Sequence, residues 1–365
     1  MSNYNKPIQL LCVLVVVLFF INNQFVQRTT WSRGLRSPPL DSRIFQEKSE
    51  IERSTLPPIP KGFLSSKLAS TARLANHIFE LVSVYGMAKS LNRKPAIFVE
   101  DSKYNLLITG VRKVLPGLLD EFQIFEYPVH NKATKVPLSE KCCIFDNPDK
   151  FNNISSEYLH LTGHFYQSWK YFDKYKEKVQ SFVKPAIDFS PLPNSDSSNF
   201  ISRICIHIRR TDFVDGQHHS SNVSFIKPAL EFIKEREQKD VNKKMLTVIM
   251  GDDPDFEAKM FEGTVRAKKE AKIEETTKYF VSENTPQDDL AYSHYSCDAT
   301  LITAPSSTFG WWLGYLSKGQ AVYYQDIRST NDVNYKKGVL DPDDFFVPSW
   351  TSIMLDENKK VVVVT

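Results

Sequence analysis

The chain has 365 residues, 41% of them hydrophobic, which is enough for a sizeable core and for two domains. Its 46 basic and 43 acidic residues nearly cancel, so nucleic acid is not an expected partner. The sequence contains no G-x-x-x-x-G-K-[ST] loop and no G-x-S-x-G motif. These absences disfavour kinase, NTPase and serine hydrolase chemistry.

An apolar segment near the N-terminus predicts a membrane anchor. The run Ile8–Ile21, extended to Val26, reaches roughly the 20 residues that a membrane helix needs. A cleaved signal peptide is the alternative, although no small-x-small cleavage site closes the run. No second apolar run in the sequence is long enough to span a bilayer. We therefore expect one signal anchor at residues 8–26, after a short cytosolic tail at residues 1–7.

The charges that flank this segment leave its orientation open. Lys6 and the terminal amine favour a cytosolic N-terminus, whereas Arg28, Arg33 and Arg36 on the far side oppose it. The polar residues that follow predict a stem over residues 27–60, whose last part is stiffened by prolines. The rest of the chain is expected to form one soluble body.

Two further features fit a lumenal body. The cysteines outside the apolar segment are even in number and compatible with two disulfides, although buried free thiols are an equal alternative. Asn153 and Asn222 begin N-x-S/T triplets, which are glycosylated only in a secretory compartment but also arise by chance. No CxxC or clustered Cys/His spacing indicates zinc. The cysteines concerned are Cys142, Cys143, Cys205 and Cys297.

The body begins with a helical pattern at Ala72–Leu91, in which apolar residues recur on one face. An aromatic segment that starts at His164 runs into a charged helix. We expect an N-terminal α/β domain over residues 61–190. Its other predicted elements are strands at Ala96–Glu100, Gln123–Tyr127 and Cys143–Phe145, and a helix at Asn105–Asp120.

A segment rich in proline and serine, Pro191–Phe200, predicts a domain boundary. Beyond it, strand and helix patterns alternate regularly. This alternation predicts a parallel sheet covered on both faces, over residues 201–355, whose ligands would bind beyond the carboxyl ends of the strands. The predicted strands are Ile204–Ile208, Leu246–Met250, Tyr279–Val281, Ala299–Thr303 and Ala321–Tyr324, and the predicted helices are Phe225–Gln238, Phe256–Phe261, Asp288–Ser296 and Thr308–Leu316.

The segment CIHIRRTDF places arginines where a buried strand ends. If its isoleucines share one face of the strand, His207 and Arg209 lie on the other face. Arg210 then begins the following loop, where a guanidinium can bind phosphate oxygens through two hydrogen bonds. The alternative is structural, because either arginine could form a salt bridge with Asp212 or Asp215.

A second strand ends in Asp252 and Asp253. A carboxylate at this edge can accept hydrogen bonds from a ribose or from a base N–H. The acid-x-acid pairs Asp253–Asp255 and Asp341–Asp343 favour a rival interpretation as Mg²⁺ or Mn²⁺ ligands. Helix capping is a third interpretation of the same aspartates.

Three hydroxyl residues, Ser306–Thr308, precede an apolar helix. Their side chains can cap the helix, and its free N–H groups and dipole can bind an anion; capping alone explains the pattern equally well. Trp311 and Trp312 are expected in the core. Together, an arginine, a carboxylate and a hydroxyl-rich helix start at the strand ends of one sheet predict a site for a nucleoside diphosphate.

Several segments, in order along the chain, resemble glycosyltransferase family 11, the α1,2-fucosyltransferases. The resemblance implies a GT-B-like fold of two Rossmann-like α/β domains, with the acceptor bound mainly by the N-terminal one. It also implies an inverting, metal-free Golgi enzyme, anchored as a single-pass type II membrane protein, that uses GDP-fucose and a glycan or glycoprotein acceptor. The segments are Arg73–Lys94, His164–Phe172, His207–Asp212, Ser306–Trp312 and Asp341–Trp350.

The same resemblance implies roles for individual residues. Arg210 would hold the pyrophosphate, and His207 and Arg209 would shape the site. The acceptor hydroxyl must lose a proton, for which Asp212 is the candidate base, unless it only orients Arg210. The remaining implied donor contacts are Asp252 or Asp253 at the guanosine, and Ser307, Thr308 and Phe309 at the phosphate and the sugar.

One loop departs from the family's pattern. It usually reads G-x-L-G-N, whereas here Ala72 and Ala75 replace the glycines and Asn76 is retained as a donor contact. Glycine lets the backbone approach a ligand closely, so two added Cβ atoms would crowd the donor. One alternative is therefore a family member that has lost transfer and acts as a glycan-binding or partner protein. Another anchored Golgi transferase, either metal-dependent or a sulfotransferase, is the second alternative.

Overall fold

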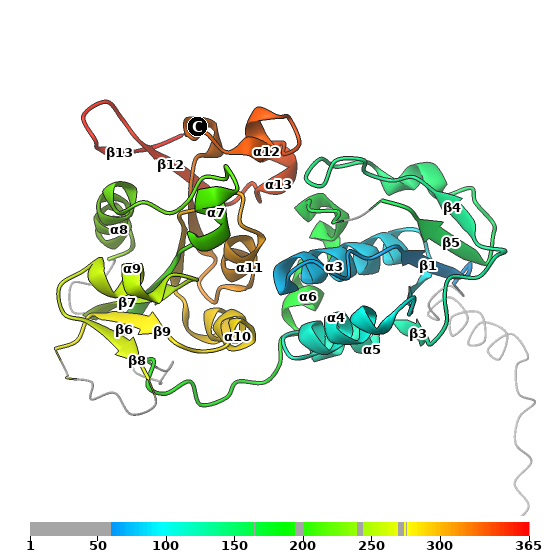
Figure 1. The fold of residues 1–365 in the computed structure, drawn as a ribbon, viewed down its shortest axis with the longest axis horizontal. Helices are drawn as coiled ribbons and strands as arrows, with labels where there is room; N and C mark the ends of the chain where they lie inside the picture. Colours follow the sequence, from blue (N-terminus) through cyan, green and yellow to red (C-terminus); the bar gives the residue numbers. More distant parts are fainter. Residues whose placement is uncertain are drawn as a thin grey trace, which may run out of the picture. The chain divides into compact units, whose positions relative to one another are not determined.

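The computed structural model describes residues 60–163, 165–193, 201–238, 244–268, 274 and 276–364. The predicted tail, signal anchor and stem lie outside these residues, apart from Pro60, and so do His164 and most of the predicted domain boundary. No helix within the described ranges combines the length and the apolar character that crossing a membrane requires. The described residues form a mixed α/β fold with two sheets whose strands are mainly parallel (Figure 1).

The first sheet has five parallel strands in the order β3-β2-β1-β5-β4. The sequence predicted β2 and β3 but missed β1, β4 and β5. The strands are β1 Phe63–Ser66, β2 Lys94–Phe98, β3 Gln123–Phe125, β4 Thr134–Val136 and β5 Tyr158–Leu161. The helices of this half are α3 Leu74–Ser90, α4 Ser102–Arg112, α5 Pro116–Asp120 and α6 Lys176–Gln180, with 3₁₀ turns η1 Pro148–Phe151, η2 Trp169–Tyr171 and η3 Asp173–Tyr175.

Helix α3 is buried on all sides rather than on the one face that was predicted. Every residue from His77 to Ala88 is buried. The reason is that α3 packs on β1 and β2 of its own sheet, on α4, and also on α11 of the second half of the chain. The apolar periodicity therefore understated how much of this helix is inside the protein.

Two local predictions in the first half are wrong. The single helix predicted at residues 105–120 is two helices, α4 and α5, because Pro116 lacks an N–H and pushes Leu115 out of the helical region. The strand predicted at Cys143–Phe145 forms only an isolated bridge, from Cys143 to Leu340. There the N–H of Phe145 donates to the carboxylate of Asp344 instead of to a neighbouring strand.

The second sheet has eight strands in the order β13-β12-β11-β10-β6-β7-β9-β8, all parallel except β13. The predicted strands correspond to β6, β7, β9, β10 and β11, whereas the edge strands β8, β12 and β13 were not predicted. The sheet also extends beyond residue 355, the predicted end of the domain. The strands are β6 Ile201–His207, β7 Lys244–Met250, β8 Thr264–Ala267, β9 Tyr279–Ser282, β10 Ala299–Ile302, β11 Ala321–Gln325, β12 Thr351–Leu355 and β13 Val361–Val363.

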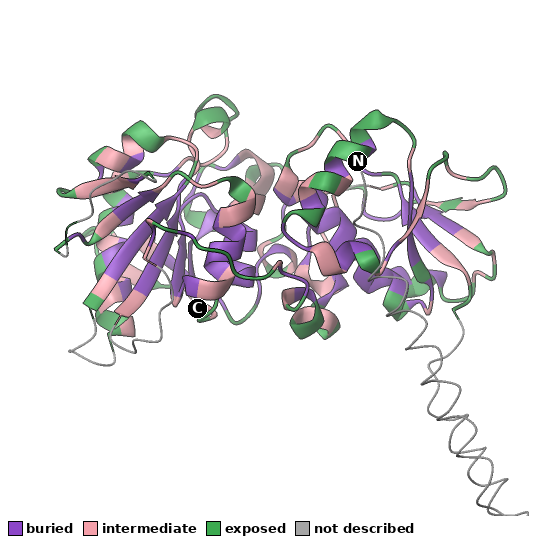
Figure 2. Cartoon of the chain, turned by 90° about the horizontal axis from the view of Figure 1, so that it is seen from below, coloured by how far each residue is buried: buried purple, intermediate pink, exposed green. Residues whose placement is uncertain are grey.

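Helices cover both faces of this sheet, as predicted (Figure 1). Ile204 and Ile206 of β6 pack in the core beneath α8, and Cys205 between them belongs to the core shared with α11 and α3. The strands are buried over most of their length (Figure 2). The helices are α7 Thr211–Asp215, α8 Val223–Glu237, α9 Pro254–Lys259, α10 Pro286–Ser296, α11 Thr308–Leu316, α12 Val333–Lys336 and α13 Pro342–Phe345, with the 3₁₀ turn η4 Ile327–Ser329.

The four cysteines of the body form two disulfides. Cys205 of β6 is joined to Cys297, which lies two residues before the neighbouring strand β10. Cys142 is joined to its neighbour Cys143. The first of these bonds links segments that are 92 residues apart in the sequence, so it restricts the unfolded chain strongly.

An aromatic contact joins the two halves of the body. Trp311 and Trp312 of α11 are fully buried, and their rings lie 4.5 and 5.0 Å from the ring of Phe79 in α3. The indole N–H of Trp312 donates to the carbonyl of Ala75 at 3.1 Å. Helix α11 is therefore held on the first turn of α3 by both packing and a buried hydrogen bond.

We expect Trp312→Ala to lower the free energy of unfolding by about 3–5 kcal/mol, because it leaves a cavity and removes the buried hydrogen bond to the carbonyl of Ala75. Urea denaturation of both proteins measures this loss. Trp169→Ala is the matched control, since Trp169 is only partly buried, and it should cost less. An equal loss in the two variants would contradict the importance of the contact between α11 and α3.

Candidate active site

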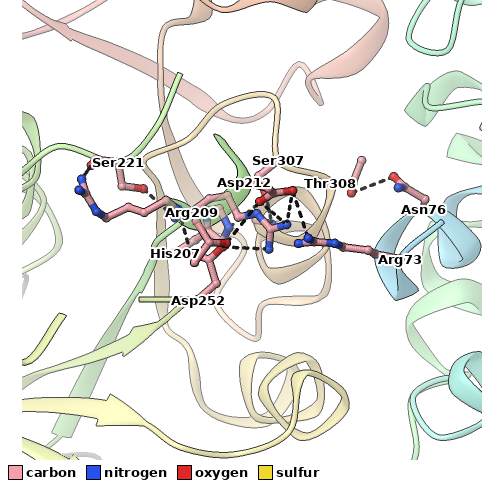
Figure 3. A network of polar contacts seen from close by, with 12 residues as sticks. Arg73, Asn76, His207, Arg209, Asp212, Ser221, Asp252, Ser307 and Thr308 are labelled. Atoms are coloured by element: carbon pink, nitrogen blue, oxygen red, sulfur yellow. Dashed lines mark hydrogen bonds and ion pairs between the residues drawn. The ribbon is translucent and has the colours of Figure 1, made fainter. Parts of the chain in front are cut away.

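The candidate site lies at the carboxyl end of β6. Strand β6 is paired with β7 on one side and with β10 on the other, so the strand order reverses at β6. Ligands of open α/β sheets bind at such a reversal. The residues that follow these three strands meet here, and Figure 3 shows their polar contacts.

His207, the last residue of β6, is completely buried beneath the start of α11. Its Nε2 lies 3.1 Å from the hydroxyl of Ser307. Helix α11 can come this close because residue 310 is glycine; a Cβ there would lie 2.6 Å from Nδ1 of His207. Burial lowers the pKa of His207 to about 4, against the smaller opposing effect of Asp252. The ring is therefore neutral at physiological pH.

Arg209 points its guanidinium into the contact network at the centre of Figure 3. A terminal nitrogen lies 2.8 Å from a carboxylate oxygen of Asp212, and the other lies 3.3 Å from Asp252. The Nε atom is buried and has no hydrogen-bond partner among the described residues. An unpaired buried N–H is costly, so this atom is suited to an anionic ligand that would complete its hydrogen bonding.

Arg210 is engaged by different groups. Its Nε donates to Asp253 at 3.1 Å, a terminal nitrogen donates to the carbonyl of Ser221 at 2.9 Å, and the guanidinium lies 4.0 Å from the centre of the Phe256 ring. Both arginines thus form salt bridges, as the structural alternative from the sequence predicted. Arg210, however, pairs with Asp253 rather than with Asp212 or Asp215. Of the two, Arg209 is the one directed toward the start of α3.

Asp212 lies between two guanidinium groups. It pairs with Arg209 from one side and with Arg73, at 3.3 Å, from the other. Arg73 belongs to the loop before α3 and was not among the site residues expected from the sequence. Because both oxygens of Asp212 face cations, this geometry fits an orienting role better than the role of a base.

Asp252 and Asp253 both support the loop after β6. Asp252 accepts hydrogen bonds from the backbone N–H of Arg210 and the hydroxyl of Thr211. Asp253 caps α9 by accepting from the N–H of Phe256, so the capping interpretation applies to it. Across the described residues, no three or more His, Cys, Asp or Glu side chains are arranged to hold a metal ion.

The hydroxyl residues before α11 have separate partners. Ser307 caps the helix at the N–H of Gly310, as predicted. Thr308 donates to the side-chain oxygen of Asn76 at 3.1 Å, which connects α11 to the start of α3. Phe309 is partly exposed, with its ring 6.2 Å from that of His207. The structure therefore brings the predicted residues 76, 207, 307, 308 and 309 together.

The alanines of the first loop fit its backbone without strain. Neither Ala72 nor Ala75 has a positive φ, so glycine is not required there for conformational reasons. Ala75 is buried and its carbonyl accepts from Trp312. The departure from G-x-L-G-N is compatible with the observed loop.

Sequence reasoning missed Ser221, which organises both arginines. Its hydroxyl accepts from the backbone N–H of Arg209 and from the hydroxyl of Thr303, and its carbonyl accepts from Arg210. Only its position just before α8 could have drawn attention to it. The neighbouring Asn222 is exposed and caps α8 through Ser224, and Asn153 is also exposed. Glycosylation of the two asparagines stays a prediction.

The chain belongs to glycosyl transferase family 11, whose family profile matches residues 64–354. It is 38% identical over 304 residues to a putative galactoside 2-alpha-L-fucosyltransferase of Caenorhabditis elegans, covering 83% of this chain and 82% of the relative. A galactoside 2-alpha-L-fucosyltransferase of the same species is 33% identical over 310 residues, with 79% and 76% covered. A mutant of Arabidopsis thaliana FUT1 in complex with GDP aligns with a TM-score of 0.39 at 10% identity, over 78% of this chain and 75% of that one.

The buried His207 predicts a loss of stability in acid. In the unfolded chain it takes up a proton near pH 6.5, whereas in the native protein it does so only near pH 4. The unfolded state therefore binds more protons between these values, and stability falls as the pH falls through this window. Between pH 7 and pH 5 the wild type should lose about 2 kcal/mol more than His207→Gln.

Urea denaturation at the two pH values measures this difference. His130→Gln removes an exposed histidine outside the site and should keep the pH dependence of the wild type. If His207→Gln and the wild type lose the same free energy of unfolding, then His207 is not held neutral by the fold.

Proposed function

We propose that this chain transfers L-fucose from GDP-fucose to a glycan hydroxyl in α1,2 linkage, with inversion and without a metal ion. The family membership and the names of its relatives support this function. The observation that carries it is the Nε of Arg209, which is buried just after β6 and has no hydrogen-bond partner in the part of the chain that the structure describes. It offers a hydrogen bond to an anion at the reversal of strand order, where a nucleotide would bind.

The diphosphate would lie between Arg209 and the first turn of α11. The N-terminus of this helix adds free N–H groups and a partial positive charge. Arg73 supplies a second guanidinium on the far side of Asp212. The guanosine would then extend past the end of β7, toward Asp252 and Asp253.

Transfer needs this positive charge. As the acceptor oxygen attacks the anomeric carbon, the bond from that carbon to the diphosphate breaks and negative charge grows on the phosphate oxygens. Preorganised donors at this position stabilise the transition state by up to about 4 kcal/mol each. Arg209 is preorganised, because Asp212 and Asp252 hold its guanidinium and Phe213 lies 5.4 Å beneath it.

We also propose how the domains are used and where in the cell the protein is located. The two sheets would be the Rossmann-like halves of a GT-B-like enzyme, with the acceptor bound mainly by the first half. The predicted anchor at residues 8–26 would hold this body in the Golgi lumen as a single-pass type II protein. The disulfides and the exposed sequon asparagines are compatible with such a compartment.

The alternative is a lapsed family member, in which the Cβ atoms of Ala72 and Ala75 would crowd the donor. Binding of GDP together with transfer of labelled fucose by the wild type separates the proposed enzyme from this alternative. A metal-dependent transferase is not favoured, because Asp253 and Asp341, from the two acid-x-acid pairs, serve as helix caps.

Alanine variants of the two arginines distinguish donor binding from a structural role. In the full-length chain, with EDTA present, Arg209→Ala should weaken GDP binding about 10- to 100-fold, because it removes a charge-assisted hydrogen bond to the diphosphate. Arg210→Ala should affect GDP affinity less and lower thermal stability more, since it removes contacts to Asp253 and Ser221. Calorimetric titration with GDP and transfer of labelled fucose measure both effects.

If GDP binding is lost in Arg210→Ala and kept in Arg209→Ala, then Arg210 rather than Arg209 binds the pyrophosphate. Well-folded wild-type protein that binds no GDP would contradict the proposed function itself.

A further inference from the structure

A histidine and a buried aspartate lie next to the proposed donor site and have no part in the function described so far. Asp332, the cap of α12, has no exposed surface. One of its oxygens accepts from the hydroxyl of Ser306 at 2.5 Å and from the N–H of His219 at 3.0 Å. The same oxygen lies 3.6 Å from Nδ1 of His218. The other oxygen accepts from the N–H of Asn334, which completes the cap.

Asp332 keeps its charge although it is buried. Burial acts to raise the pKa of this carboxyl, but the His218 ring, the Ser306 hydroxyl and the N–H of His219 outweigh it and lower the pKa to about 2. A carboxylate is therefore fixed beside one nitrogen of His218 at every pH near neutrality.

The two ring nitrogens of His218 have different surroundings. Nδ1 is buried and lies 3.6 Å from the carboxylate of Asp332, without a hydrogen bond to any described residue. Nε2 also forms no hydrogen bond with a described residue. The side chain is 27% exposed, so Nε2 is accessible from outside. A carboxylate beside one ring nitrogen, with the second nitrogen left to take a proton, is a feature of histidine bases.

His218 is close to the proposed diphosphate site. The ring of Phe213 lies 4.7 Å from the His218 ring and 5.4 Å from the guanidinium carbon of Arg209, so a single aromatic ring separates the two. Ser306, which holds Asp332, directly precedes the residues that begin α11. The base and the diphosphate would thus occupy the same edge of the sheet.

We propose that His218 is the general base that takes the proton of the acceptor hydroxyl, and that Asp332 is the residue that positions it. The proposal rests on the fucosyltransferase function above. The acceptor oxygen forms a bond to the anomeric carbon of fucose, and the bond to the diphosphate breaks with its electron pair going to GDP. The acceptor proton moves to Nε2 of His218, and the imidazolium then returns it to solvent.

The charged surroundings of His218 agree with this role. Asp332 faces the ring from the loop before α12, and Arg209 lies beyond Phe213 on the side of β6. His219, the neighbour in sequence, is turned away and contacts Gln325 at the end of β11. Asp212, the base considered from the sequence, is engaged by Arg73 and Arg209 instead.

His218→Gln in the full-length chain tests the proposal. We expect kcat for fucose transfer to fall about 100-fold or more, as when a general base is removed. The KM for GDP-fucose and the affinity for GDP should stay within about threefold, because no donor contact is lost. In the wild type, kcat should depend on the protonation of the base and fall in acid, and this dependence should be absent in His218→Gln.

Asp332→Asn is the second variant, since asparagine keeps the cap of α12. Loss of the carboxylate should lower kcat while the KM for GDP-fucose stays within about threefold, a split that general loss of structure would not produce. His130→Gln is the control and should retain the profile of the wild type.

The outcomes are distinct. Transfer by His218→Gln at the wild-type rate, or with an unchanged pH profile, would overturn the proposal while leaving the fucosyltransferase function intact. If His218→Gln loses both GDP binding and transfer, the proposal is also overturned, because His218 would then support the donor. A wild type that binds GDP and transfers no fucose would overturn the proposed function and this proposal together.

Discussion

Helix α11 reaches the candidate site only because its aromatic residues are buried against α3. Trp312 donates to Ala75, Phe79 packs against both tryptophans, and Thr308 donates to Asn76. Since α11 begins after β10 and α3 begins after β1, this one contact brings loops from both sheets beside β6. Without it, the start of α11 would lack a partner on α3, and Arg73 would lie outside the reach of Asp212.

The charges of the site form an alternating series around this contact. Arg73, Asp212, Arg209 and Asp252 follow one another at ion-pair distances. Partly buried charges are costly unless each has a partner. The series supplies partners, while the Nε–H of Arg209 has none among the residues described. A diphosphate would compete with Asp212 for the two arginines. The aspartates thus hold the guanidinium groups in place before the donor arrives, which reduces the reorganisation that binding requires.

Much of this arrangement could be predicted from the sequence. Regular strand and helix alternation predicted the second sheet and the edge at which its ligand residues gather, and strand periodicity assigned Ile204 and Cys205 to opposite faces of β6. Capping by Ser307 and Asp253 followed from local chemistry. These features depend on neighbours in the sequence, which is why pattern reasoning found them.

The partners of the arginines could not be predicted in this way. Strand alternation ends at His207, so the directions of Arg209 and Arg210 are set by the loops that surround them. Those loops contribute Asp252, Ser221 and Arg73, which lie far apart in the sequence. The short strands β1, β4 and β5 were missed for a related reason, since their stability comes from pairing with one another rather than from a local pattern.

A crystal structure of the chain with GDP, grown without divalent cations, would test the account most directly. We expect a phosphate oxygen of GDP within hydrogen-bond distance of Nε of Arg209 and the β-phosphate at the first turn of α11. The contact between Thr308 and Asn76 should remain beside it. GDP bound at another edge of the sheet, or held by Arg210 with the Nε of Arg209 still unpaired, would contradict the account.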